Sequence, residues 1–363
     1  MQPPTLRILI PFTVIALLTA ACGDTADDTA DTTLAPTTTT VETTTTLPPT
    51  TTVAPTTTIE TTTTASSPES GVTITKDSVY LEIDGDEYLV DVYVPAGDGP
   101  WPVVVALHGA LVYKDNSFTT RPARAAAEAG MLVFAPNWVA EWPALSDMDA
   151  EAVRSWTQVL RCALAFAQQE AAGYGGDSTR TVVYGKSAGA SSGANLVLSP
   201  FTDLPTGCLG QSPPVAPVGA VFGDAEYFDH ATWWDGAFDE DLEEMQAIVA
   251  ETVDPAFWSS AVPARFRFWA AADGTFPRSF DDLWDEDGWF AQRDPDGTIR
   301  ADLDELGALE DGAVDYIDSG LLLATRLQQA GIDTTFDVLP GDHATHISSP
   351  TLVDYLLDAA GNG

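Results

Sequence analysis

The stretch "TVVYGKSAGASSG", Thr181 to Gly193, is compatible with two different folds. Its "GKS" matches the end of a phosphate-binding loop, and its "GKSAG" matches the Gly-x-Ser-x-Gly turn that presents a nucleophilic serine. A phosphate-binding loop needs a glycine five residues before Gly185, but the chain has Arg180 there. The intervening "TVVY" is typical of a strand. The order of a strand, Ser187 and then a helix of small residues therefore favours the nucleophile turn.

Short apolar runs alternate with helical patterns on both sides of this stretch. Residues 78–83 and 88–95 flank an Asp-Gly turn signal, which predicts an antiparallel hairpin. Further strands are predicted at 102–109, 131–138, 179–185, 217–224, 265–273 and 334–341. Helices are predicted at 121–130, 146–176, 187–199, 314–331 and 350–362.

This alternation predicts an α/β fold with a mostly parallel central sheet flanked by helices on both faces. Two segments interrupt it, at 225–263 and 277–312; both are acidic and rich in aromatic residues. Because they follow strand ends, we expect these insertions to cover the carboxyl edge of the sheet, where open α/β sheets bind ligands.

The first 70 residues are predicted to lie outside the folded domain. Residues 1–21 contain the apolar run "ILIPFTVIALLTAA", too short for a membrane span and typical of a signal peptide. The ending "LTAAC" resembles a bacterial lipoprotein signal with an acylated Cys22; an ordinary signal peptide is the alternative. Residues 22–70 are rich in Thr and Pro and predict a disordered stalk. We expect an exported protein, tethered to a membrane only through a lipid, with its folded domain at 71–363.

The net charge limits the kinds of binding partner that can be expected, and the cysteines indicate the kind of compartment. The 54 acidic and 15 basic residues give a net charge of −39, which argues against binding to nucleic acid or anionic lipid surfaces. If Cys22 is acylated, Cys162 and Cys208 remain as a pair. In an exported protein such a pair predicts a disulfide, and two buried free thiols are the alternative. The oligomeric state is left open.

The block "QQEAAGYGGDSTRTVVYGKSAGA", residues 168–190, resembles exported carboxylesterases. More widely, the chain is similar to the esterase and dienelactone-hydrolase-like branch of the α/β-hydrolase superfamily, over about residues 72–360. The resemblance implies a nucleophile, an acid and a histidine in that chain order. Ser187 is then the nucleophile, Asp273 the acid after the penultimate strand, and His343 the base after the last strand.

Alternatives remain for two of these roles. Asp224 also follows a strand and is the second candidate for the acid, while His346 is the second candidate for the base. His108 lies in a His-Gly segment that the resemblance assigns to the oxyanion hole, and is expected to be positional rather than the base. His230 is expected to be incidental.

The resemblance also implies where the oxyanion donors lie. The Ala188 amide is one expected donor, and the Ala110 or Leu111 amide is the second. Lys186 is expected to lean towards solvent beside the turn, with a Ser-Lys dyad as the alternative.

The predicted reaction is hydrolysis of a carboxylic ester through an acyl-enzyme on Ser187. No cofactor or metal is expected. The tryptophans of the insertions could line an acyl pocket or form a local core. A prolyl-oligopeptidase-like serine peptidase is one alternative; a noncatalytic surface-binding protein on the same fold is another. The identity of the ester does not follow from the residues.

Overall fold

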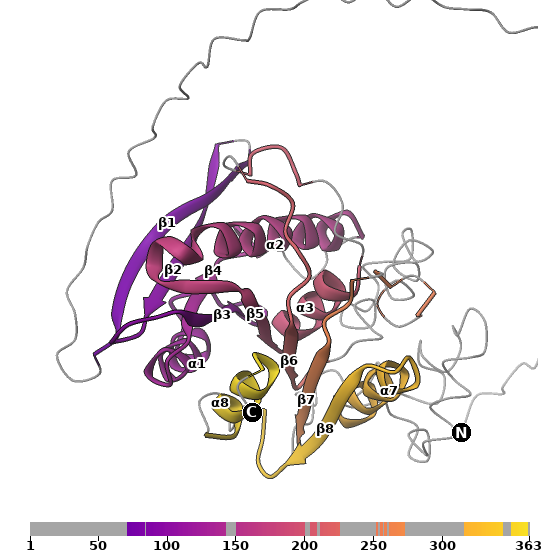
Figure 1. Cartoon of the computed structure of the whole chain (residues 1–363). Coiled ribbons are helices and arrows are strands. Elements are labelled where there is room, and N and C mark those ends of the chain that lie inside the picture. The colour runs from indigo at the N-terminus through magenta and orange to yellow at the C-terminus, as the bar shows by residue number, and fades with distance from the viewer. Residues whose placement is uncertain are drawn as a thin grey trace, which may run out of the picture. The chain divides into compact units, whose positions relative to one another are not determined.

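An eight-stranded sheet runs through the described part of the chain (Figure 1). The computed structural model describes residues 71–83, 85–142, 150–199, 204–208, 211–225, 261–272, 316–343 and 350–361, with residues 252, 255, 256, 258 and 259. All of these lie within one compact unit of the chain.

The strands follow the spatial order β1-β2-β4-β3-β5-β6-β7-β8. They are β1 (Thr73–Ile83), β2 (Asp86–Val94), β3 (Trp101–Leu107), β4 (Leu132–Pro136), β5 (Gly176–Lys186), β6 (Gly219–Gly223), β7 (Arg265–Ala271) and β8 (Asp333–Leu339). The pairs β1–β2 and β2–β4 are antiparallel, and every pair from β4 to β8 is parallel. The predicted fold class and the predicted hairpin are therefore confirmed.

The helices cover both faces of this sheet, as Figure 1 shows. They are α1 (Ser117–Glu128), α2 (Ala150–Glu170), α3 (Ala188–Leu198), α7 (Tyr316–Gln329) and α8 (Pro350–Ala359), with a short 3-10 helix at Ala171–Tyr174. Residues of α1 and α8 belong to one buried apolar cluster, and residues of α2, α3 and α7 belong to another. The central strands are buried on both sides because each side has its own core, which explains their continuous apolar runs.

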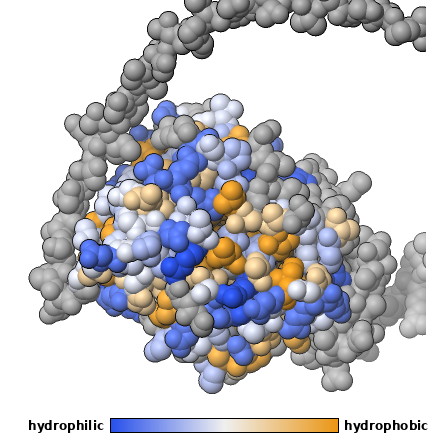
Figure 2. All heavy atoms as spheres, in the orientation of Figure 1, coloured by the Kyte–Doolittle hydropathy of each residue, from blue (hydrophilic) through white to orange (hydrophobic). Residues whose placement is uncertain are grey.

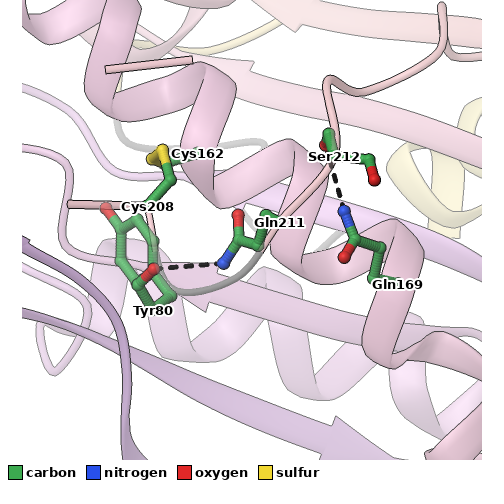
Figure 3. Close-up of a disulfide and its surroundings, with 6 residues drawn as sticks. All are labelled: Tyr80, Cys162, Gln169, Cys208, Gln211 and Ser212. Atoms are coloured by element: carbon green, nitrogen blue, oxygen red, sulfur yellow. Dashed lines mark hydrogen bonds between the residues drawn. A yellow bond between two sulfur atoms is a disulfide. The ribbon is translucent and has the colours of Figure 1, made fainter. Parts of the chain in front are cut away.

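A disulfide ties the segment after α3 to α2, as the cysteine pairing predicted (Figure 3). It joins Cys162 to Cys208, whose Cα atoms are 5.7 Å apart. Cys208 also forms an isolated bridge with Leu81 of β1. Nearby, Gln211 donates to the Tyr80 carbonyl over 3.1 Å. The segment after the helix therefore returns to the β1 edge of the sheet.

The two predicted aromatic insertions lie largely outside the described residues. Of their tryptophans the structure describes Trp258, which packs against the larger core and donates from Nε1 to the Thr252 carbonyl over 2.9 Å. This tryptophan has a packing role.

The viewed surface mixes hydrophilic and hydrophobic residues, as Figure 2 shows. None of the described helices is both long and apolar enough to cross a membrane. Within the described part of the chain, no group of three or more His, Cys, Asp or Glu residues could hold a metal ion.

Candidate active site

Ser187 occupies the sharp turn between β5 and α3. Its backbone angles are φ 55° and ψ −135°, a conformation that is costly for a residue with a side chain. The Ser187 amide donates to the Gly223 carbonyl of β6 over 3.0 Å, and the Ser187 carbonyl accepts from the Ala190 amide over 2.7 Å. These bonds hold the strained turn in place, which is the behaviour expected of a nucleophile presented at a strand end.

The glycines around Ser187 allow this turn to pack closely. A Cβ added at Gly185 would collide with the Gly189 backbone, and one at Gly189 would lie 2.5 Å from the His108 carbonyl oxygen. Side chains at either position would therefore push α3 away from β3 and β5. The Gly-x-Ser-x-Gly spacing is thus required by contacts on both sides of the turn.

The loop after β3 lies beside the nucleophile. A Cβ added at Gly109 would be 3.5 Å from the Ser187 Cβ and 3.9 Å from its Oγ. Leu111, two residues on, has a φ of 58° and is 64% exposed. The structure therefore brings the segment expected to hold the second oxyanion donor next to Ser187. The roles of the Ala110 and Ala188 amides remain predictions.

His108 is buried and fixed by Trp138. The two rings stack with centroids 5.0 Å apart, and the Trp138 amide donates to His108 Nε2 over 3.4 Å. His108 Nδ1 is 2.9 Å from the Gly109 carbonyl, so the neutral ring with its proton on Nδ1 satisfies both contacts. Burial lowers the pKa of His108 to about 4, although the Gly109 carbonyl acts in the opposite direction. This agrees with a positional rather than a base role.

Asp224 follows β6 and is fully buried at the same edge of the sheet. Its φ is 46°, and its Oδ1 accepts a hydrogen bond of 2.6 Å from the Ala271 amide. Its Oδ2 lies 3.4 Å from His343 Nδ1 and 3.5 Å from Lys186 Nζ. The structure therefore gathers a carboxylate, an imidazole and an ammonium group at the ends of three different strands.

Lys186 does not lean towards solvent, and that expectation was wrong. Only 7% of the residue is exposed, and Nζ lies 5.8 Å from the centre of the Trp269 ring, in addition to its contact with Asp224. The reason is the register of the sheet: Lys186 pairs with Gly223, whose missing side chain makes room for Trp269. Burial lowers the pKa of Lys186, and the charges of Asp224 and Asp342 oppose that effect.

Comparison with known proteins identifies esterases as similar in sequence and in structure. The Carboxylesterase family profile matches residues 47–212. Liver carboxylesterase B-1 from Rattus norvegicus is 29% identical over 136 residues, covering 36% of this chain and 24% of that protein. The chain thus spans about a quarter of the length of the curated relatives it matches.

Two solved structures share the fold. Esterase B from Lactobacillus rhamnosis has a TM-score of 0.52 at 14% identity, covering 80% of this chain and 84% of that one. A truncated carbohydrate esterase from gut microbiota has a TM-score of 0.52 at 15% identity, covering 81% and 98%. The chain has the α/β-hydrolase fold. The matching family model and both structural neighbours are named as esterases.

Within this fold, the structure describes Ser187, His343 and Asp224 among the predicted site residues. It brings His343 to Asp224, the second candidate for the acid. Asp273 and His346 lie outside the described residues, as do His230 and Cys22. The assignment of Asp273 as the acid and the choice between His343 and His346 therefore remain predictions.

An aromatic cluster beside the β3 loop was missed at the level of sequence. Trp142 and Trp156 pack edge-on against Trp138, with ring centroids 5.3 and 5.7 Å away. Trp142 Nε1 donates to the Val112 carbonyl over 3.1 Å, and the Tyr113 hydroxyl lies 3.4 Å from the Trp142 amide. The cluster thus supports the loop that carries Gly109. The available signal was the occurrence of two tryptophans directly after the β4 strand.

Proposed function

We propose that this α/β-hydrolase cleaves carboxylic esters through an acyl-enzyme formed on Ser187. The observation that carries the proposal is the strained Ser187 turn with the Gly109 loop lying against it. The amides at the start of α3 and in that loop would stabilise the negative charge that develops on the substrate oxygen. Curated relatives named as carboxylesterases support the ester as the bond cleaved.

His343 is the proposed base. Its Nδ1 faces the Asp224 carboxylate, which leaves Nε2 for the Ser187 hydroxyl. In the first half-reaction the Ser187 oxygen bonds to the acyl carbon, and its proton passes through the histidine to the departing alcohol. In the second, water attacks the acyl-enzyme, its proton passes to the histidine, and the acid is released as the serine regains a proton.

Two carboxylates are candidates for the third member of the triad. Asp273 is supported by its place after β7 in the chain order implied by the resemblance. Asp224 is supported by its 3.4 Å contact with His343 Nδ1. We expect the Asn variant of the true acid to lower kcat by about 10⁴-fold, because the imidazole then adopts the wrong tautomer. Comparing Asp224→Asn with Asp273→Asn on one ester assigns the role.

The first experiment measures hydrolysis of a short-chain p-nitrophenyl ester by Ser187→Ala. We expect kcat to fall by about 10⁴-fold or more while the protein stays folded. Ser192→Ala is the matched control, since Ser192 is buried in the same helix α3. A Ser187→Ala protein that turns over the ester at the wild-type rate would refute the proposal. His343→Ala and His346→Ala assign the base in the same assay.

We also propose that the protein is exported and held at a membrane by a lipid on Cys22. The signal-like run at 1–21 supports export, and so does the disulfide, because disulfides persist in oxidising compartments. Metabolic labelling with a fatty acid should mark the wild type and leave Cys22→Ala unmarked. Label retained by Cys22→Ala would contradict the anchor.

A further inference from the structure

The serine mechanism described above gives no role to Lys186, although the carboxylate that it contacts, Asp224, is a candidate for the acid. Lys186 ends β5, one residue before the nucleophile, and Asp224 directly follows β6. Both are buried, and the same Asp224 oxygen that lies 3.5 Å from Lys186 Nζ lies 3.4 Å from His343 Nδ1. Burying a lysine costs free energy that an ion pair offsets only in part, so its position beside the nucleophile calls for an explanation.

We propose that Lys186 is a positioning residue that acts through Asp224 to set the basicity of His343. The inference rests on the proposed function, since it concerns the base of that reaction. Asp224 is held at its other oxygen by the Ala271 amide, so its carboxylate cannot turn away without losing a hydrogen bond of 2.6 Å. Lys186 and His343 therefore share the remaining oxygen, Oδ2.

The charges of Asp224 and Lys186 act on His343 in opposite directions. The negative Asp224 carboxylate favours the protonated imidazole, whereas the positive Lys186 ammonium disfavours it. Since both nitrogens lie on the same oxygen, they are no more than about 7 Å apart. Lys186 and Asp224 are buried and the His343 side chain is 37% exposed, so charges at that distance still interact through a medium less polar than water. Lys186 thus offsets part of the negative charge that Asp224 presents to His343.

The other charged or titratable groups near this cluster are few within the described residues. Asp342, on the loop that carries His343, acts on Lys186 through its charge. Tyr184 on β5 is buried, and burial together with the charge of Asp224 raises its pKa, so it stays a neutral phenol. The neighbour from β7 is Trp269, which carries no charge. Among the described residues, Lys186 is therefore the cation that faces Asp224 from the strands beside it.

The test is the pH dependence of kcat/KM for a p-nitrophenyl ester, whose acidic limb reports the base of the free enzyme. In Lys186→Met we expect the acidic limb to move to higher pH by about one unit, because the Asp224 charge is no longer offset. Lys186→Arg keeps the charge and should restore the wild-type limb. Lys186→Gln is a second neutral variant in case the methionine variant does not fold.

Lys76→Met is the matched control for net charge. Lys76 pairs with Asp91 and Asp115 at the β1–β2 edge, so its loss changes the total charge equally without touching the cluster. Its acidic limb should coincide with that of the wild type. An equal shift in this variant would mean that the effect is a general one of charge and would overturn the proposal.

A double-variant comparison tests whether the effect passes through Asp224. In an Asp224→Asn background, Lys186 is buried without its partner carboxylate and should lose its proton, so Lys186→Met removes no charge and should no longer raise the acidic limb. A rise that persists in this background would show that the effect does not depend on Asp224 and would overturn the proposal. If the acidic limb of kcat/KM in Lys186→Met is unchanged or moves to lower pH, the inference is overturned. The proposed function still stands in that case, provided that Ser187→Ala is inactive. Full activity of Ser187→Ala would instead overturn the function itself.

Discussion

Two buried lysines in this molecule differ in the number of carboxylates that lie near their ammonium groups. Lys114, in the loop between β3 and α1, is 1% exposed and lies 2.6 Å from Asp77, 2.9 Å from Asp91 and 3.3 Å from Asp115. Lys186 has one carboxylate within ion-pair distance among the described residues, Asp224 at 3.5 Å.

The consequence appears in the two pKa values. Burial lowers the pKa of Lys114, but hydrogen bonds to Asp77 and Asp91 and the charges of Asp91 and Asp115 outweigh it, so the net pKa is raised. Burial dominates for Lys186, and its net pKa is lowered. One lysine is fully compensated and supports the framework. The other is under-compensated and lies at the candidate active site, where strain and perturbed groups collect.

The largest expected effect is the loss of folding stability when Lys114, the lysine of the framework, is replaced. Lys114→Met leaves the buried Asp91 without its buried cation, with the half-exposed Lys76 as its remaining partner, and we expect the free energy of unfolding to fall by about 3–5 kcal/mol. Lys76→Met is the control, because Lys76 reaches the same Asp91 from a side chain that is 44% exposed and should cost at most about 1 kcal/mol. Urea unfolding measures both, and equal losses would refute the distinction.

The disulfide lies in the same framework as Lys114. Cys208 forms a β-bridge with Leu81 of β1, and β1 also carries Asp77, a partner of Lys114. Replacing Cys162 and Cys208 together by Ala should lower the free energy of unfolding by about 2–4 kcal/mol, since the bond closes a loop with a sequence separation of 46. Folded protein should keep its kcat. A large loss of kcat at full folding would show that this side also shapes the site.

Lys186→Met should lower the free energy of unfolding by about 1–3 kcal/mol, the cost of leaving one buried Asp224 oxygen without this partner, which is less than the loss expected for Lys114→Met. The variant removes a lysine whose burial is incompletely offset, and Asp224 keeps its hydrogen bond from the Ala271 amide. The measurement is urea unfolding at neutral pH beside Lys114→Met. A loss for Lys186→Met as large as that for Lys114→Met would mean that both lysines serve the framework.

Much of this arrangement follows from the sequence, and the exceptions have physical causes. The order of strands and helices and the Ser187 turn could be predicted because they depend on local patterns of apolar residues and glycine spacing. The burial of Lys186 could not, because it depends on the register that pairs Lys186 with Gly223 and on a tryptophan from a third strand. Local composition carries no information on that register.

The acid of the site is ambiguous in the sequence for a related reason. Asp224 and Asp273 both follow strands that end at the same edge, and chain order alone favours the later one. Which carboxylate reaches the histidine depends on the path of the loop after β8 across neighbouring strands. The structure supplies that information for His343 and Asp224, at 3.4 Å.

The smallest expected effect, and the most specific one, is the pH dependence of stability at alkaline pH. For Lys186 the folded-state pKa is lowered, so the unfolded chain binds more protons between that value and the ordinary 10.5, and stability rises with pH in this window. For Lys114 the folded-state pKa is raised, so the stability it contributes below 10.5 is lost as pH rises further.

Urea unfolding of the wild type and both methionine variants from about pH 8 to about pH 11 compares these signs directly. The wild type should gain stability relative to Lys186→Met as pH rises towards 10.5 and lose stability relative to Lys114→Met above it. Tyrosines that titrate in the same range contribute equally to the wild type and to each variant, so their contribution cancels in each difference. If both differences changed in the same direction, the two lysines would not differ in compensation, and the contrast between framework and site would fail.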